Sequence, residues 1–335
     1  MSSYTSAEVP VRGGTLHTGI WGPNDPQAPA ILAIHGVTAS HRTWGMVAAA
    51  LPDVRVIAPD LRGRGRSNTL PGPYGMPVHA DDLAAVLEAL TVPSAVVVGH
   101  SMGAFAALVL ANRHPHLVES LVLVDGGLPL DVPSGLSDEQ VIQAVLGPAA
   151  ERLEQVFESP ADYEQFWAPH PAFAGHWNDL LRDYLAYDLQ PHGSGFRAAT
   201  STQALLEDTA ELHRGTALLQ ALDQLAHPVQ LLRAPRGLLD EEPGLYSPDY
   251  IASWQAKLPD LRISDVPGTN HYTIVMDDPG AAAVAGVLAG EAVSRRLPAG
   301  EAPASRVVCE VPGRGQLPSG DTPRADQTGG WIRWL

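Results

Sequence analysis

One short segment of the sequence carries the residue types of a nucleophilic catalyst. It reads Gly99-His100-Ser101-Met102-Gly103, with a serine between two glycines. The segment follows the Val-rich run 95–98 and precedes the Ala-rich run 102–112, which we interpret as a strand and a helix. Glycines two positions before and after the serine leave room for strand and helix to approach each other through a strained turn. Such a turn holds the hydroxyl above the edge of a sheet, where it can attack a carbonyl carbon.

The helix that begins at Met102 is expected to contribute to the same chemistry. Its first N–H groups have no partner within the helix, and the helix dipole places partial positive charge at that end. Both would face the oxyanion that forms when Ser101 attacks a carbonyl. The segment therefore predicts a nucleophile together with part of an oxyanion hole.

The composition bounds the fold that must position these groups. The chain has 335 residues, of which 45% are hydrophobic and 17% are charged, enough for one large domain or one domain with an insertion. The single cysteine, Cys309, cannot form an internal disulfide, and no Cys/His pair has zinc-ligand spacing. Residues 1–10 do not resemble a signal peptide, and no apolar run approaches the length of a membrane span. We therefore expect a soluble, cytoplasmic protein without a bound metal.

The formal net charge of −16 narrows the range of partners. Phosphate backbones and anionic lipid surfaces repel such a charge, so we expect no nucleic acid and no membrane partner, despite the cluster Arg62, Arg64 and Arg66. A small molecule is the expected ligand. The sequence does not indicate an oligomeric state.

Alternating strands and helices are predicted for the first 125 residues. The chain opens with a hairpin of antiparallel edge strands around Gly13-Gly14, a pair that tolerates the positive φ of a tight turn. Strands are predicted at 9–11, 15–21, 30–34, 54–58, 95–98 and 121–124, and helices at 43–51, 77–90 and 102–112. This order predicts a parallel sheet with right-handed crossovers.

The alternation stops after the first third of the chain and returns later. Residues 128–226 contain no convincing buried strand but several aromatic-rich amphipathic helices. Strands return at 229–232 and 261–266, with helices at 248–257 and 279–293. We therefore predict an α/β core over 1–127 and 227–296 and an inserted helical cap over 128–226. The Pro- and Gly-rich segment 297–335, which ends in two tryptophans, is predicted to be a disordered tail.

The chain resembles the α/β-hydrolase fold family over roughly residues 9–293. Four motifs carry the resemblance: His35-Gly36 after the third predicted strand, Asp60 to Ser67 after the fourth, the turn at Ser101, and Asn270-His271 after the last strand. The resemblance implies a mostly parallel, eight-stranded α/β sheet with a helical cap. Epoxide hydrolases and haloalkane dehalogenases share this fold but carry aspartate at the place of Ser101, so the serine favours a serine hydrolase.

The resemblance also implies roles for residues around Ser101. The backbone N–H groups of Val37, directly after His35-Gly36, and of Met102 would form the oxyanion hole. His271 occupies the place of the general base, the neutral imidazole that accepts the serine proton during attack. No metal or organic cofactor is needed for this chemistry.

Other polar residues of these motifs are expected to be structural. His35 and Arg62 would brace their loops by hydrogen bonding, and His100 would pack beneath the nucleophile. The chain has thirteen histidines. Five that lie outside the predicted cap are His17, His41, His79, His114 and His116. We place them in loops or on helix surfaces away from the carboxyl ends of the strands, where a solvated or structural role is expected.

Two aspartates are candidates for the acid that orients His271. The family's usual place, just after the strand 229–232, here reads Arg233-Ala234-Pro235-Arg236-Gly237 and contains no carboxylate. Asp240 lies three residues further along. Asp125 follows the strand that comes after the Ser101 helix, which is an alternative acid site of the family. Zearalenone-type lactonases are one subgroup that resembles this arrangement. We favour Asp125, because Asp240 needs a longer loop to fold back.

The predicted cap and its aromatic side chains indicate the class of substrate. They would roof Ser101 and form an apolar pocket suited to a hydrophobic ester, lactone or thioester, and Trp177 is singled out as a substrate contact. The expected reaction is hydrolysis through an acyl-enzyme on Ser101. C–C bond hydrolysis or acyl transfer by the same triad are alternatives, as is a receptor-like protein that binds a small ligand.

Overall fold

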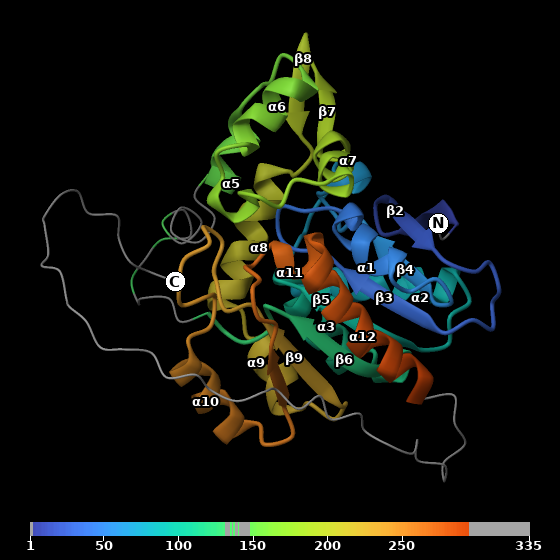
Figure 1. Cartoon of the computed structure of the whole chain (residues 1–335). Helices are drawn as coiled ribbons and strands as arrows, with labels where there is room; N and C mark the ends of the chain where they lie inside the picture. The colour runs from blue at the N-terminus through green and yellow to red at the C-terminus, as the bar shows by residue number, and fades with distance from the viewer. Residues whose placement is uncertain (1–2, 131–134, 136, 138–139, 141–147, 295–335) are drawn as a thin grey trace, which may run out of the picture.

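The structure is a computed structural model that describes residues 3–130, 135, 137, 140 and 148–294. Its centre is an eight-stranded sheet in the order β1-β2-β4-β3-β5-β6-β9-β10 (Figure 1). The strands are β1 (Tyr4–Val11), β2 (Gly14–Trp21), β3 (Ala30–Ile34), β4 (Arg55–Pro59), β5 (Ala95–His100), β6 (Val118–Val124), β9 (Val229–Arg233) and β10 (Arg262–Asp265). β1 pairs antiparallel with β2 and β2 with β4, and every other pair is parallel. The predicted fold class is confirmed.

Both faces of the sheet are apolar because neighbouring strand residues point to opposite sides. In β3, Leu32 and Ile34 contribute to one core cluster, and Ile31 and Ala33 to the other. The first cluster is covered by α2 (Met76–Ala89), α3 (Met102–Arg113), α9 (Ala217–Asp223) and α10 (Pro248–Lys257). The second is covered by α1 (Gly45–Ala49), α11 (Thr273–Met276) and α12 (Asp278–Ser294). The sheet is therefore buried between two helical layers.

The strand order reverses between β3 and β5. β4 follows β3 in the chain and lies on one side of it, whereas β5 lies on the other side. The loops after β3 and β5 therefore diverge, and ligands of open α/β sheets bind in such a crevice at the carboxyl ends of the strands. Ser101 and the His35-Gly36 pair follow these two strands, so the topology brings them to the same place.

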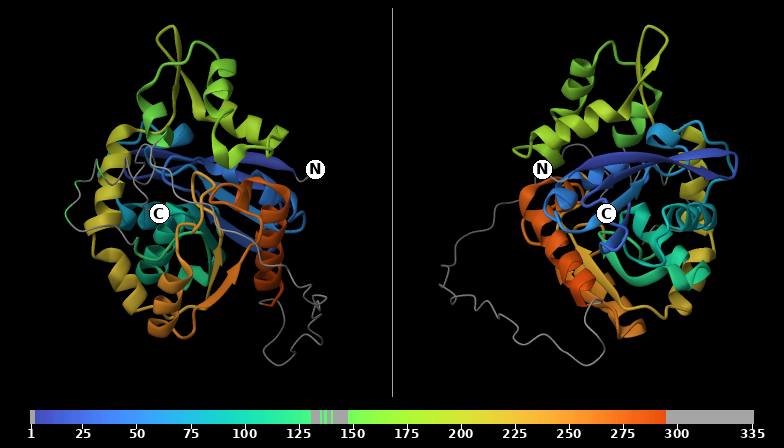
Figure 2. Two further views of the ribbon diagram at one scale, coloured as in Figure 1. Left: turned by 60° about the vertical axis from the view of Figure 1, so that its left-hand side comes forward. Right: turned by 90° about the vertical axis from the view of Figure 1, so that its right-hand side faces the viewer.

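A separate group of short elements stands above the carboxyl edge of the sheet (Figures 1 and 2). These upper elements are α5 (Pro148–Glu151), α6 (Pro160–Trp167), α7 (Asp179–Asp188) and a hairpin of β7 (Leu189–His192) and β8 (Gly195–Ala198), with the turns between them. This hairpin is not among the elements predicted from the sequence. Its strands have four residues each and are only partly buried, so they leave no apolar run of the kind that marks a buried strand.

The second half of the predicted insertion packs against the main body. α8 (Thr202–Arg214) descends from the upper elements along the side of the molecule in Figure 1 and leads into α9. Leu218, Ala221 and Leu222 of α9 belong to the same core cluster as α2 and α3. The limits of the cap stay a prediction. The predicted tail and Cys309 lie outside the described residues.

Several predicted elements differ in extent from those observed. The helix expected over 43–51 is a 3-10 turn, η1 (His41–Trp44), followed by the short α1. The strand expected over 121–124 begins at Val118, because its backbone already pairs with Ala95 of β5. The helix expected over 279–293 begins at Asp278 and is preceded by the single turn α11. Among the described residues, no helix is long and apolar enough to cross a membrane.

Buried ion pairs hold the loop that follows β4. Arg62 donates from Nε and Nη2 to the carboxylate of Asp82 at 2.9 and 2.8 Å, and the predicted role of Arg62 as a brace agrees with this contact. Arg64 pairs with Asp208 of α8, and both side chains are fully buried. His79 of α2 lies 3.0 Å from the same carboxylate. These contacts join the loop to α2 and α8.

We predict that Asp208→Asn destabilises the fold strongly. Burial alone would raise the pKa of Asp208, but Arg64 and His79 outweigh it and lower the pKa from 3.8 to about 2. Removing this charge leaves Arg64 buried without its partner, which should cost about 3–5 kcal/mol in the free energy of unfolding, measured by urea denaturation. In the unmutated protein, the contribution should be complete above about pH 4 and lost as the pH falls towards 2.

Asp81→Asn provides the matched control for this prediction. Asp81 pairs with Arg113 and His114 on the surface, where its side chain is half exposed. This substitution should cost less than about 1 kcal/mol. Equal losses in the two variants would contradict the role given to the buried pair.

Candidate active site

Ser101 lies in a sharp turn between β5 and α3. Its φ and ψ are 54° and −126°, a conformation that residues with a side chain rarely adopt. A Cβ on Gly99 would lie 2.2 Å from the Gly103 carbonyl oxygen, and a Cβ on Gly103 would lie 2.1 Å from the carbonyl oxygen of Ile34. The Ser101 N–H donates to the Val124 carbonyl at 3.0 Å. Only glycine fits beside this turn, and the neighbouring strands hold it in place.

The loop after β3 lies directly against the turn. A Cβ on Gly36 would lie 3.2 Å from the Cβ of Ser101. The Gly36 carbonyl accepts hydrogen bonds from His35 Nδ1 at 2.8 Å and from the Ala39 N–H at 3.3 Å. Because the C=O and N–H of a trans peptide point in opposite directions, these bonds also set the direction of the Val37 N–H.

His35 is the brace that the sequence analysis expected. Its Nδ1 donates to Gly36, so its Nε2 can accept the N–H of Leu61 at 2.9 Å. Burial lowers the pKa of His35 from 6.5 to about 4, and the ring is therefore neutral at pH 7. A neutral ring has the one donor and one acceptor that this arrangement uses.

The two backbone donors of the predicted oxyanion hole are available for a ligand. Within the described part of the chain, the N–H groups of Val37 and Met102 have no hydrogen-bond acceptor. The Met102 N–H begins α3, so the positive end of the helix dipole lies at the same place. Donors of this kind stabilise an oxyanion without the cost of reorganising them during the reaction.

His271 and Asp125 form a buried hydrogen-bonded pair. Nδ1 of His271 lies 2.7 Å from Oδ2 of Asp125, and the two residues are 4% and 0% exposed. The other carboxylate oxygen accepts the N–H of Ala234 at 3.1 Å. With Nδ1 held by the carboxylate, Nε2 is the nitrogen left to accept a proton. Ser101 Oγ makes no hydrogen bond to any of the described residues. The hydrogen bond between a nucleophile and its base often forms only when substrate binds.

The turn that carries Asp125 packs against the turn that carries Ser101. Asp125 has a φ of 43°, a left-handed conformation that aspartate tolerates better than most residues. A Cβ on the next residue, Gly126, would lie 2.3 Å from the Ser101 carbonyl oxygen. This close backbone approach explains the glycine and fixes the distance between the carboxylate and the nucleophile.

Asp240, the alternative acid, contacts the residue next to His271. Its carboxylate accepts hydrogen bonds from Asn270 Nδ2 and from Arg236 Nη1, both at 3.0 Å. Its side chain is 32% exposed. The geometry therefore brings Asp125 and His271 together and leaves Asp240 in a separate surface network.

His100 packs against His271. Its Nε2 donates to the His271 carbonyl at 2.7 Å, and the two rings lie 4.7 Å apart. Burial, followed by the nearby His271, lowers the pKa of His100 well below its ordinary value, so its ring stays neutral. The role expected from the sequence, packing beneath Ser101, stays a prediction, whereas this hydrogen bond and this ring contact are with His271.

Two other histidines are more buried than expected. The sequence predicts loops or helix surfaces for His41 and His79, but both side chains are fully buried. His41 lies 2.8 Å from Asp60 and His79 lies 3.0 Å from Asp208. Asp60 lies 19 residues from His41 and Asp208 lies 129 residues from His79 along the chain, and neither pairing follows from sequence position.

Aromatic side chains extend from the base towards the upper elements. The ring of Tyr272 lies 5.6 Å from His271 and 5.1 Å from Phe173, and Phe173 lies 5.6 Å from Trp167. Trp177, the predicted substrate contact, is half-buried beside the same apolar cluster. The guanidinium carbon of Arg182 lies 5.9 Å from the centroid of the Trp177 ring. The structure does not bring Trp177 into contact with Ser101 or His271.

Two residues that position the site were missed in the sequence. Arg64 Nε donates to the Val37 carbonyl at 2.9 Å. The sequence marks Arg64 only as one of three clustered arginines. Asn270 Nδ2 donates to the Ala172 carbonyl at 2.9 Å and so ties the His271 loop to the upper elements. The motif positions of both residues were visible, but their partners lie far away along the chain.

Two of the relatives found by sequence carry the names of hydrolases. Lipase LipV of Mycobacterium tuberculosis is 32% identical over 238 residues, which cover 62% of this chain and 85% of the lipase. The 2-(acetamidomethylene)succinate hydrolase of Mesorhizobium japonicum is 26% identical over 245 residues, which cover 73% of this chain and 82% of that enzyme.

Solved structures agree with the sequence comparisons. The thioesterase domain of the curacin biosynthetic pathway superposes with a TM-score of 0.69 at 22% identity, over 86% of this chain and 99% of that domain. E-2-(acetamidomethylene)succinate hydrolase superposes with a TM-score of 0.68 at 25% identity, over 86% and 97% of the two chains. The sequence model of the alpha/beta hydrolase fold matches residues 29–161. With the sheet order and the serine turn described above, these matches establish that the chain belongs to the α/β-hydrolase fold family.

Proposed function

We propose that the protein is a serine hydrolase that cleaves a hydrophobic ester or lactone through an acyl-enzyme on Ser101. The observation that carries the proposal is the strained serine turn beside the buried His271–Asp125 pair. A nucleophile, a base and an acid that orients the base are the parts that acyl transfer needs. The relatives named as a lipase and as a hydrolase support the reaction class.

The reaction begins when Ser101 Oγ attacks the substrate carbonyl carbon. His271 Nε2 accepts the hydroxyl proton, and the Asp125 carboxylate stabilises the resulting imidazolium through Nδ1. The carbonyl oxygen becomes an oxyanion that accepts hydrogen bonds from the N–H groups of Val37 and Met102. Collapse of this intermediate expels the alcohol, which takes the proton from His271 and leaves the acyl group on Ser101.

Water then releases the acyl group by the reverse sequence of proton transfers. His271 removes a proton from the water as it attacks the acyl-enzyme carbonyl, and then returns that proton to Ser101 Oγ. In a lactone the alcohol remains part of the acyl chain, so one hydroxy acid is the product. Neither half of the reaction calls on a metal or an organic cofactor.

The aromatic residues beside His271 support an apolar acyl or alcohol group. Tyr272 packs against His271 and is only partly buried, whereas Phe173 and Trp167 form apolar core behind it. An accessible aromatic ring beside His271 gains free energy by covering apolar substrate, whereas a charged substrate would need polar partners. We therefore place hydrophobic esters and lactones ahead of charged substrates.

We predict that Ser101→Ala abolishes covalent labelling by a fluorophosphonate and lowers the turnover of a short p-nitrophenyl ester by about 10⁶-fold. Labelling is read by mass spectrometry and turnover by absorbance. Ser94→Ala is the control, because Ser94 lies before the opposite end of β5 and donates to Glu119. Labelling of wild type without turnover of any ester, lactone or thioester in a panel would favour a binding protein instead.

The triad acid is tested by two matched substitutions. Asp125→Asn should lower kcat by about 10⁴-fold, because an amide beside Nδ1 favours the wrong tautomer of His271. Asp240→Asn should keep most of the activity, since Asp240 contacts Asn270 and Arg236. Near-full activity of Asp125→Asn with loss in Asp240→Asn would reverse the assignment.

Trp177 remains a proposed substrate contact and has its own test. Trp177→Leu should raise KM for a long-chain ester and leave kcat nearly unchanged, because a contact with the substrate's apolar part acts equally in ground and transition states. Trp254→Leu on α10 is the control, since Trp254 packs against Tyr250 and Lys257. An unchanged KM in Trp177→Leu would remove Trp177 from the binding site.

A further inference from the structure

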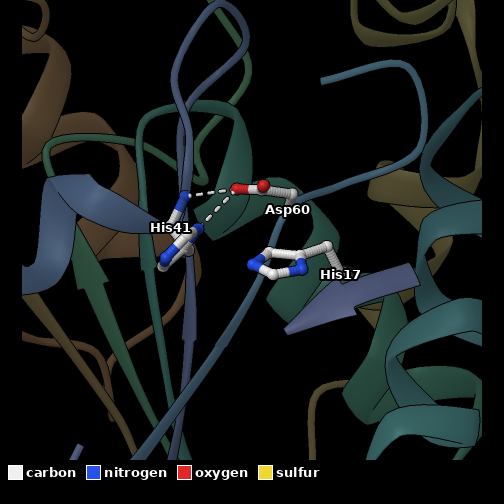
Figure 3. Close-up of side chains that lie close together, drawn as sticks. All are labelled: His17, His41 and Asp60. Carbon is white, nitrogen blue, oxygen red and sulfur yellow. Dashed lines mark hydrogen bonds and ion pairs between the residues drawn. The ribbon is translucent and has the colours of Figure 1, made fainter. Parts of the chain in front are cut away.

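Outside the serine site, two histidines and an aspartate converge near the end of β4. His17 comes from β2, His41 from η1 and Asp60 from the residue directly after β4 (Figure 3). Each residue offers one nitrogen or oxygen atom, and these atoms all lie within 4.8 Å of one another. None of the three has a role in the proposed reaction.

His17 directs one ring nitrogen towards the other two residues. Its Nδ1 lies 2.6 Å from Oε1 of Glu8, which makes Nδ1 the protonated nitrogen. The remaining nitrogen, Nε2, then carries a lone pair, and the ring in Figure 3 faces His41 and Asp60. In the described part of the chain, His17 Nε2 has no hydrogen-bond partner. A carboxylate behind a histidine is the usual support of a metal-ligating imidazole.

His41 has a matching support on its far side. Its Nδ1 lies 2.8 Å from Oδ1 of Asp60, and its Nε2 lies 3.0 Å from the hydroxyl of Tyr4. A tyrosine hydroxyl can donate or accept a hydrogen bond. His41 can therefore carry its proton on Nε2 instead of Nδ1, with the Nε2–H donating a hydrogen bond to the Tyr4 hydroxyl oxygen. This tautomer leaves Nδ1 with a lone pair.

Asp60 presents a single oxygen to the two histidines. Its Oδ2 accepts the Arg66 N–H at 2.8 Å and the Tyr187 hydroxyl at 2.6 Å, and its Oδ1 faces His41. These hydrogen bonds fix the orientation of the carboxylate.

We propose that His17 Nε2, His41 Nδ1 and Asp60 Oδ1 bind a divalent first-row transition-metal ion, with Zn²⁺ the expected occupant. Two imidazoles and one carboxylate suit Zn²⁺ better than Mg²⁺ or Ca²⁺, which prefer oxygen ligands. Three protein ligands leave the fourth tetrahedral position to water. The net effect is to tie β2, η1 and the loop after β4 together at one point.

Small movements of the three side chains complete the geometry. Zn–N bonds of about 2.0–2.1 Å place tetrahedral ligand atoms about 3.3 Å apart. His17 must therefore move towards the other two ligands, and His41 Nδ1 and Asp60 Oδ1, now 2.8 Å apart in a hydrogen bond, must separate slightly once the proton between them is lost. His41 and Asp60 are fully buried, whereas the His17 side chain is 15% exposed and can shift. The same exposure gives the ion a path from solvent. The sequence could not reveal this site, because its ligands come from three separate segments.

The test is Zn²⁺ binding by the full-length protein in competition with a chromophoric chelator. Wild type should bind one Zn²⁺ with a micromolar dissociation constant. His17→Gln removes a ligand and should weaken binding at least about tenfold, and Glu8→Gln should weaken it about tenfold by releasing the ring of His17. Both substitutions lie at the surface hairpin, and circular dichroism checks that the variants fold.

Co²⁺ provides a readout that a purely structural role would not change. Co²⁺ bound to four ligands that include imidazole gives intense visible absorption, which wild type should show and His17→Gln should lose. His114→Gln is the matched control, because His114 also faces a carboxylate, Asp81 at 2.8 Å, but lies outside the cluster. Absence of saturable Zn²⁺ binding in wild type would overturn the proposal, and so would equal affinities in wild type, His17→Gln and Glu8→Gln.

Discussion

The close approach of backbone around Ser101 is the constraint on which the rest of the site depends. The serine keeps a conformation that its side chain disfavours, and the cost of such strain is on the order of 1–3 kcal/mol. The surrounding chain holds it there from three sides. Gly103 contacts the end of β3, the Ser101 N–H bonds to β6, and Gly126 contacts the Ser101 carbonyl. One side chain larger than hydrogen at these glycines would push the strand ends apart.

The same packing determines which carboxylate can reach His271. Because Gly126 lies against the serine turn, Asp125 ends β6 within hydrogen-bond distance of His271. The loop after β9 supplies the Ala234 N–H to the Asp125 carboxylate. Asp240 lies further along that loop, where it accepts a hydrogen bond from Asn270. A carboxylate placed on β6 is therefore held by two neighbouring strands, whereas one on the longer loop would depend on that loop alone.

Buried charges carry the positioning outward from the centre. Arg64 binds the Val37 carbonyl and is itself neutralised by Asp208, so a helix far along the chain stabilises the loop that carries Val37. Tyr187 of α7 reaches down to Asp60 in the same way. Such pairs add little net stability relative to an apolar core, but breaking one leaves an unpaired charge that is costly to bury. They make the loops around the nucleophile depend on the elements above and beside them.

The sequence by itself determined most of the elements and the turn at Ser101, and the tertiary structure decided their partners. Apolar runs and glycine spacing are local properties, so the strands, the main helices and the turn at Ser101 could be predicted. The β7–β8 hairpin escaped because its short, half-exposed strands have no apolar run. Asp125 and His271, like His79 and Asp208, come from segments more than a hundred residues apart. His41 meets Asp60 from a neighbouring loop. No local pattern in the sequence predicts any of these three contacts. An ionisable side chain acquires its role from the charge that folding places beside it, and that pairing exists only in three dimensions.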